Sequence, residues 1–228
     1  MLYEPNFKND DKSLFRFERK WLFKTNHLDL LNKSFKSGFN FNIQHPKRNV
    51  NSLYFDDHNY TSVKQNLDGV SDKSKIRLRW YGKDIFLISN AKLEIKVKKN
   101  FLNYKILYDM KDLNNKNLKK LNDVKHITTK INRILNKKIL IPTVTTHYER
   151  FYLISLNKKI RATIDYNLKG TNFMHFNYNP VFKNSSNSIL ELKYDKKFDQ
   201  YVRKNCTSIS NRYSKSSKYV YFVMNCYK

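Results

Sequence analysis

Polar and apolar residues alternate along many short segments of the chain. In KIRLRWYG (75–82), the first, third and fifth residues are cationic and the residues between them are apolar, so a strand would carry the two kinds of side chain on opposite faces. The same period of two predicts strands over residues 14–23, 48–56, 74–81, 85–89, 91–99, 143–155, 158–168 and 188–195. The chain is therefore expected to build a sheet with one apolar face.

Apolar residues at helical spacing lie between some of these strands. They predict helices over residues 25–36, 57–69, 101–141, 195–206 and 213–227. The third of these would bury a stripe formed by Leu118, Leu121, Ile127, Ile131, Ile134 and Leu135. Asp56 or Asp57 is expected to cap the second helix, and Pro142 to end the third. A polar leader covers residues 1–13, and because no long linker divides the rest, residues 14–228 are expected to form a single α+β domain.

Six of the predicted strands share a face that is charged and mostly cationic. The residues concerned are Arg16, Glu18 and Lys20; Lys75, Arg77 and Arg79; Glu94, Lys96 and Lys98; Tyr148 and Arg150; Arg161 and Asp165; and Glu191 and Lys193. A solvated outer face explains one such strand, but the repetition favours an antiparallel β tunnel barrel with a charged lumen and helices packed on the outside. Unit charges about 4 Å apart repel by roughly 4 kcal/mol at an effective dielectric of about 20. A lumen lined by cations would therefore be unstable when empty. We expect it to bind a polyanion, with the carboxylates holding a divalent metal ion.

The composition also indicates a polyanionic partner. Lys and Arg total 45 of the 228 residues against 19 Asp and Glu, which gives a formal net charge of +26. Such a field attracts nucleic acid, polyphosphate, nucleotides or an anionic membrane, although a general bias towards Lys and Asn accounts for part of the Lys excess. Non-specific electrostatic affinity for nucleic acid is expected. Hydrophobic residues make up 40% of the chain, which excludes a disordered polycation.

The Cys, His and Gly residues and the apolar runs exclude several other kinds of site and protein. Cys206 and Cys226 lack the spacing of a metal site, as do the six His, and none of the four Gly forms a phosphate-binding loop. The first residues do not read as a signal peptide, and no apolar run is long enough to span a bilayer. We expect a soluble, cytoplasmic protein without a membrane segment.

Eight segments resemble, in order, the VTC (vacuolar transporter chaperone) domain: FRFERKWLF, NSLYFDDHNYTSVKQNLDG, KIRLRWYG, LEIKVKKNFLNYK, THYERFYL, IRATIDYNL, ILELKYD and KSSKYV. This domain is the polyphosphate polymerase branch of the CYTH-like triphosphate tunnel metalloenzymes, and the resemblance covers roughly residues 14–222. It implies an antiparallel tunnel barrel that binds a nucleoside triphosphate. In polymerase members, a divalent metal ion (Mn²⁺ or Mg²⁺) assists transfer of the γ-phosphate of ATP to a growing polyphosphate chain.

The resemblance also implies roles for individual residues. The phosphate-binding cations of the catalytic site would be Lys20, Arg77, Arg79, Lys96, Arg150, Arg161, Lys193 and Lys218. Further substrate contacts would come from Lys105, Tyr148, Lys215 and Ser217. Glu191 would be the principal metal ligand, and Glu18 would assist it.

Two departures from the family pattern leave other functions open. Arg16 stands where the wider superfamily has the first Glu of a Glu-x-Glu-x-Lys pattern, and no glycine follows the Ser-Lys-Tyr segment at 217–219. The expected function is a metal-dependent polyphosphate polymerase. The alternatives are a triphosphatase of the same fold and a non-catalytic module that binds polyphosphate or another polyanion.

Overall fold

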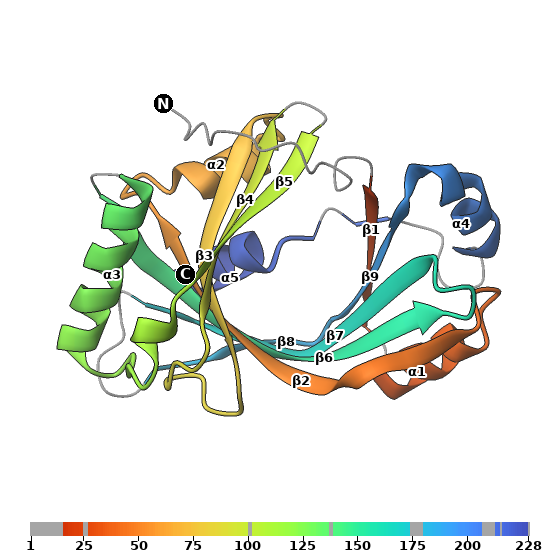
Figure 1. Ribbon diagram of the computed structural model, residues 1–228, viewed down its shortest axis with the longest axis horizontal. Coiled ribbons are helices and arrows are strands. Elements are labelled where there is room, and N and C mark those ends of the chain that lie inside the picture. The colour runs from red at the N-terminus through yellow and green to blue at the C-terminus, as the bar shows by residue number, and fades with distance from the viewer. Residues whose placement is uncertain are drawn as a thin grey trace.

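The computed structural model describes residues 16–24, 27–99, 102–136, 139–173, 180–206, 213–214 and 216–227. The strands are β1 (Arg16–Phe23), β2 (Phe41–Asp56), β3 (Lys73–Tyr81), β4 (Lys92–Lys99), β5 (Leu102–Asp109), β6 (Ile141–Ser155), β7 (Ile160–Asn172), β8 (Lys183–Ser185) and β9 (Ser188–Asp195). The α-helices are α1 (His27–Phe35), α2 (Thr61–Leu67), α3 (Leu121–Leu135), α4 (Asp199–Cys206) and α5 (Lys218–Cys226). Helices separate groups of strands along this part of the chain: α1 and α2 flank β2, and α3 lies between β3–β5 and β6–β9 (Figure 1).

All of these strands belong to one antiparallel sheet, which confirms the expected α+β class. The order is β1-β9-β7-β6-β2-β3-β4-β5, and the short β8 pairs with β7 beside that path. The long strands β2 and β6 lie in the middle of the sheet, which curves so that β1 and β3–β5 rise as two flanks (Figure 1). The expected closure into a barrel is not seen, because β1 and β5 do not pair within the described residues.

The apolar face of the sheet lies on its convex side and is covered by helices. The alternation predicted for 74–81 is confirmed in β3, where Leu78 and Trp80 are fully buried among the residues packed under α3. From α3, Ile127 and Ile131 enter the same cluster. The helices α1 and α4 cover β1, β7 and β9 in a second apolar cluster. Burial of these faces leaves the cationic faces on the concave side.

The helix α5 departs from the expectation that all helices lie outside the sheet, because it packs on the concave side (Figure 1). Tyr219 stacks on Tyr54 of β2 with ring centroids 4.8 Å apart, and its hydroxyl donates to Asp56 at 2.7 Å. Phe222 packs against Gly170 of β7 so closely that a Cβ there would lie 2.5 Å from the ring. The physical reason is that the concave face carries apolar residues at this end, and α5 buries them.

Two predicted elements are wrong. Residues 102–109, expected within a helical region, form β5, in which Tyr104 and Ile106 pack against the core under α3 while Lys105 faces the other way. Residues 85–89, expected as a strand, form a loop in which Ile88 is fully buried. Apolar residues fill the core in both segments, and a run of this length does not show by itself whether it has a strand partner.

The predicted helix boundaries hold in part. Pro142 does not end α3, which stops at Leu135, and lies instead in β6. The N-cap residue of α2 is Tyr60 rather than the expected Asp56 or Asp57. Both carboxylates still bond the first turn, since Asp57 accepts from the Thr61 amide at 3.0 Å and Asp56 from the Ser62 amide at 3.1 Å. In contrast, Leu121 is 67% exposed rather than buried, because it is the first residue of α3 and lies ahead of the packed stripe.

Candidate functional site

The cationic strand faces meet on the concave side of the sheet. Register places Lys75, Lys96 and Lys105 in one row across β3, β4 and β5. On the other flank, register places Glu18 and Lys193 side by side on β1 and β9. Lys96 donates to Glu18 at 3.1 Å, so side chains of the two flanks touch across the concave side.

Glu94 on β4 holds two of the predicted phosphate-binding cations and the predicted substrate contact Lys105. Its carboxylate lies 2.6 Å from Arg77 Nη2, 2.6 Å from Lys105 Nζ and 3.4 Å from Arg79 Nη1. Burial favours the neutral acid, but the charges of Arg77 and Arg79 outweigh it and lower the pKa of Glu94 to about 2. The carboxylate is therefore ionised at neutral pH and fixes both guanidinium groups.

Glu18 and Glu191 form a second centre, in which lysines link the two carboxylates. Lys20 Nζ lies 2.6 Å from Glu18 and 3.5 Å from Glu191, and Lys193 Nζ lies 2.8 Å from Glu191. Burial and the repulsion between the carboxylates oppose ionisation, but the lysines overcome both and hold the two pKa values below their usual range. Both groups are anionic at neutral pH.

Asp165 of β7 forms a third centre beneath α5. This fully buried carboxylate accepts from Arg150 Nε at 2.5 Å and from Lys218 Nζ at 2.5 Å. The ring of Tyr148 lies under both cations, with its centroid 5.3 Å from Arg150 Cζ and 4.6 Å from Lys218 Nζ. Burial raises the pKa of Asp165, but Arg150 and Lys218 lower it to about 2 overall. The first turn of α5 is thereby tied to the middle of the sheet.

The segment that precedes α5 contacts both flanks. The Ser214 amide donates to the Lys20 carbonyl at 2.8 Å, and Lys75 Nζ donates to Ser217 Oγ at 2.8 Å. Lys75 has no carboxylate partner among the described residues. Burial, and then the charges of Lys20 and Lys96, lower the pKa of Lys75 to about 7. The protonation state of Lys75 therefore changes close to neutral pH.

Several buried polar atoms on the concave side lack a hydrogen-bond partner in the described part of the chain. They are Arg79 Nε, Ser52 Oγ, Thr146 Oγ1 and Thr163 Oγ1. Ser52 pairs with Arg79 on one side and with Thr146 on the other, so three of these atoms belong to one row. Because buried polar groups are rarely left unpaired, this row has hydrogen-bonding capacity for water or for the oxygens of a ligand.

The structure brings most of the predicted site residues to this face. Arg161 is exposed, lies beside Lys193 and makes no ion pair among the described residues. The prediction for Lys215 falls outside the described residues. The sequence-based assignment missed the anchoring roles of Glu94 and Asp165, although both lie on the charged strand faces, and that shared face was the available signal.

The carboxylate oxygens of Glu18 and Glu191 are suitable ligands for a divalent ion that also binds phosphate. Mg²⁺ is commonly held by one or two carboxylates, substrate phosphates and water, and Mn²⁺ prefers the same oxygen ligands. Within the described ranges, no group of three or more His, Cys, Asp and Glu side chains could hold a metal ion. An ion at the two glutamates would therefore depend on oxygens from a phosphate ligand.

The chain is similar to known proteins both in sequence family and in fold. A family model described as the VTC domain matches residues 15–226. A solved structure from Vibrio parahaemolyticus, described provisionally as an adenylate cyclase, is similar in fold, with a TM-score of 0.53 and 11% identity over 92% of this chain and 99% of that one. No curated protein matches the chain. Among the helices that the structure describes, none combines the length and hydropathy needed to cross a membrane.

Proposed function

Because the chain belongs to the VTC domain family, whose model spans residues 15–226, we propose that it is a metal-dependent polyphosphate polymerase that uses ATP. The observation that carries this proposal is the concave face, where cations from both flanks of the sheet outnumber the carboxylates that fix them. Arg79 Nε is buried there without a partner in the described chain. A bound triphosphate would supply the missing negative charge and acceptor atoms.

The proposed reaction needs positioning and charge neutralisation rather than a covalent enzyme intermediate. An oxygen of the terminal phosphate of the polymer attacks the γ-phosphorus of ATP. The bond from this phosphorus to the β,γ-bridging oxygen breaks, and ADP leaves with the electron pair. Arg77 and Arg79, which Glu94 holds, would donate hydrogen bonds from their remaining N–H groups to phosphate oxygens.

The other flank would complete the site. Glu191 and Glu18 would hold Mn²⁺ or Mg²⁺, which when bound neutralises charge on the phosphate oxygens. Lys20 and Lys193 already form ion pairs with these carboxylates and would contact the phosphates that the metal ion binds. The remaining proposed contacts to the triphosphate and the polymer are Lys96, Lys105, Tyr148, Arg150, Arg161, Ser217 and Lys218.

The test is incubation of the purified protein with ATP and MnCl₂, followed by gel electrophoresis of the phosphate products. A ladder of polymers supports the proposal. Arg79→Ala should abolish the ladder, whereas Lys125→Ala, on the outer helix α3, should leave it unchanged. Release of inorganic phosphate alone would indicate a triphosphatase. Absence of turnover, with tripolyphosphate binding that is insensitive to EDTA, would indicate a binding module.

A further inference from the structure

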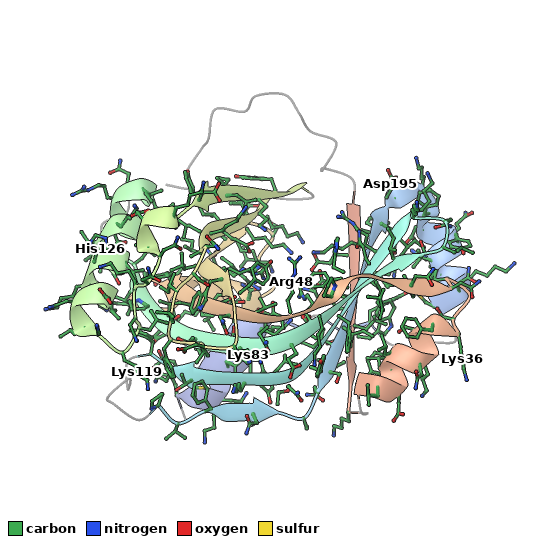
Figure 2. The ribbon with its side chains drawn as sticks, turned by 60° about the horizontal axis from the view of Figure 1, so that its bottom comes forward. Lys36, Arg48, Lys83, Lys119, His126 and Asp195 are labelled. Atoms are coloured by element: carbon green, nitrogen blue, oxygen red, sulfur yellow. The ribbon has the colours of Figure 1, made fainter. Side chains whose placement is uncertain are left out.

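Arg48 of β2 lies between two tyrosine rings, next to the Asp165 centre, since the Tyr152 ring centroid lies 5.9 Å from Arg150 Cζ. Arg48 Cζ lies 5.5 Å from the ring centroid of Tyr81 and 5.6 Å from that of Tyr152. The three residues come from β2, β3 and β6, which are neighbours in the sheet. Figure 2 shows Arg48 near the middle of the molecule, between the two flanks. The cluster is therefore part of the concave side.

The charge of Arg48 is not neutralised as that of its neighbour is. Arg48 pairs in register with Arg150, which has two hydrogen bonds to Asp165 at 2.5 and 2.8 Å. Arg48 is exposed and forms no ion pair with a carboxylate of the described residues. Tyr81 is 39% exposed. A planar cation and a tyrosine ring thus remain open to a ligand, whereas a purely structural stack would be covered.

The position of the cluster relative to the phosphate-binding cations indicates which part of a ligand it would meet. Tyr81 follows Arg79 by two residues on the same strand face, a distance of about 7 Å along the strand. Arg48 lies six residues from Tyr54, where α5 packs, which is about 20 Å along β2. The cluster therefore lies beyond Arg77 and Arg79, towards the end of the concave side that is remote from α5, and beside Arg150.

We propose that Arg48, Tyr81 and Tyr152 form the site for the base of the nucleoside triphosphate. This inference rests on the proposed function, since it places the triphosphate on Arg77 and Arg79. A ribose separates the base from the α-phosphate, so the base lies further along the strand than the phosphates do. Aromatic and guanidinium planes stack on any base without reading its hydrogen-bonding edge. Purine nucleotides should bind more tightly than pyrimidine nucleotides, with little discrimination between ATP and GTP.

Calorimetric titration with two ligands tests this site. The ligands are the β,γ-imido analogue of ATP and tripolyphosphate, each with MnCl₂. Arg48→Lys keeps the charge but removes the planar group, and Tyr152→Leu removes one ring. Each variant is expected to bind the ATP analogue about tenfold more weakly, in line with the loss of one stacking contact. Their affinity for tripolyphosphate should stay within about twofold of wild type, whereas Arg79→Ala should weaken both ligands.

The outcomes separate this inference from the proposed function. Equal losses for both ligands in Arg48→Lys would make Arg48 a phosphate contact and overturn the base site. Wild-type protein that binds tripolyphosphate as tightly as the ATP analogue would also overturn it, while the phosphate site stands. Selective loss of the ATP analogue supports the base site even if no polymer forms. Binding of neither ligand would remove both proposals.

Discussion

Arg79 and Leu78 are neighbours in sequence with opposite surroundings. Leu78 is fully buried on the convex side, while Arg79 lies on the concave side, 3.4 Å from a carboxylate that Arg77 and Lys105 approach more closely. Arg79→Ala should therefore keep the fold but lose tripolyphosphate affinity by at least about tenfold, as expected for a charged hydrogen bond. Leu78→Ala should lower the free energy of unfolding by about 2–5 kcal/mol.

Thermal melts of both variants, with and without tripolyphosphate, measure this contrast. Arg79→Ala should lose most of the ligand-induced rise in Tm, and Leu78→Ala should melt earlier but keep that rise. The assignment of faces in β3 is wrong if Arg79→Ala retains the full rise, or if Leu78→Ala melts like wild type.

Lys75 makes stability and binding depend on pH. Its pKa falls from 10.5 to about 7 in the folded protein, chiefly because of burial. The unfolded chain therefore binds this proton more tightly, and the contribution of Lys75 to stability rises as pH increases from about 7 to 10.5. Lys75→Met should be more stable than wild type below about pH 7, and the difference should shrink at higher pH. Denaturant unfolding of the two proteins across this range gives the comparison.

A bound polyanion should reverse the effect on Lys75, because a nearby negative charge favours the protonated amine. Tripolyphosphate binding near pH 8 should then take up a proton from solution, since this pH lies above the pKa of about 7 in the free protein. Calorimetry in two buffers of different ionisation enthalpy measures this uptake. Equal uptake in wild type and Lys75→Met would assign the proton to another group.

The alternation within each strand was enough to predict which residues share a face. It did not show which residues meet across the sheet. Period two correctly separated Arg77 and Arg79 from Leu78, because that separation is a property of one strand. The contact of Lys96 with Glu18 joins residues far apart in the chain and depends on how strongly the sheet curves. No local pattern encodes that curvature. The role of Glu94 was missed because it depends on the pairing of β4 with β3 and β5, which no single strand shows.

At the level of elements, α5 depends on the absence of a side chain at Gly170. A Cβ at this position would lie 2.5 Å from Phe222 Cγ and Cδ1, and Phe222 is fully buried. Gly170→Ala should therefore destabilise the fold by about 1–3 kcal/mol through overpacking. It should also weaken tripolyphosphate binding, since α5 carries Lys218. Thermal melts and calorimetric titration give the two quantities.

The matched control for this prediction is Gly170→Ala combined with Phe222→Leu. A smaller side chain on α5 makes room for the methyl group, so the double variant should recover part of the stability lost in Gly170→Ala. If Gly170→Ala alone melts like wild type, α5 does not pack against β7 as described.

The elements that the sequence predicted well are those with a clear period, such as β3 and β9. The strand β5 was assigned to one helical region together with α3, although eleven residues (110–120) separate the two elements. The location of α5 on the concave side could not be inferred either. Its partners Tyr54 and Gly170 lie on strands distant in sequence, and an apolar helix face does not reveal which layer it covers.

At the scale of the whole molecule, the net charge of +26 predicts a second, non-specific kind of binding. RNA should bind through cations spread over the surface, so its affinity should fall linearly with salt on logarithmic axes. Arg79→Ala should change RNA affinity by less than about twofold, because one charge among many is removed. Filter binding of an RNA oligomer at several KCl concentrations tests this. A loss as large as that for tripolyphosphate would place RNA in the concave site.

The open edge between β1 and β5 has a topological consequence for a long polymer. A closed ring of strands would encircle a linear chain, which could then enter or leave only by being threaded from one end. In the described structure no strand pairing joins these two edges, and side-chain contacts such as that of Lys96 with Glu18 bridge the flanks. Such contacts can part and re-form without breaking the sheet. A polymer on the concave face would thus be clasped rather than encircled, and could be released sideways along its length.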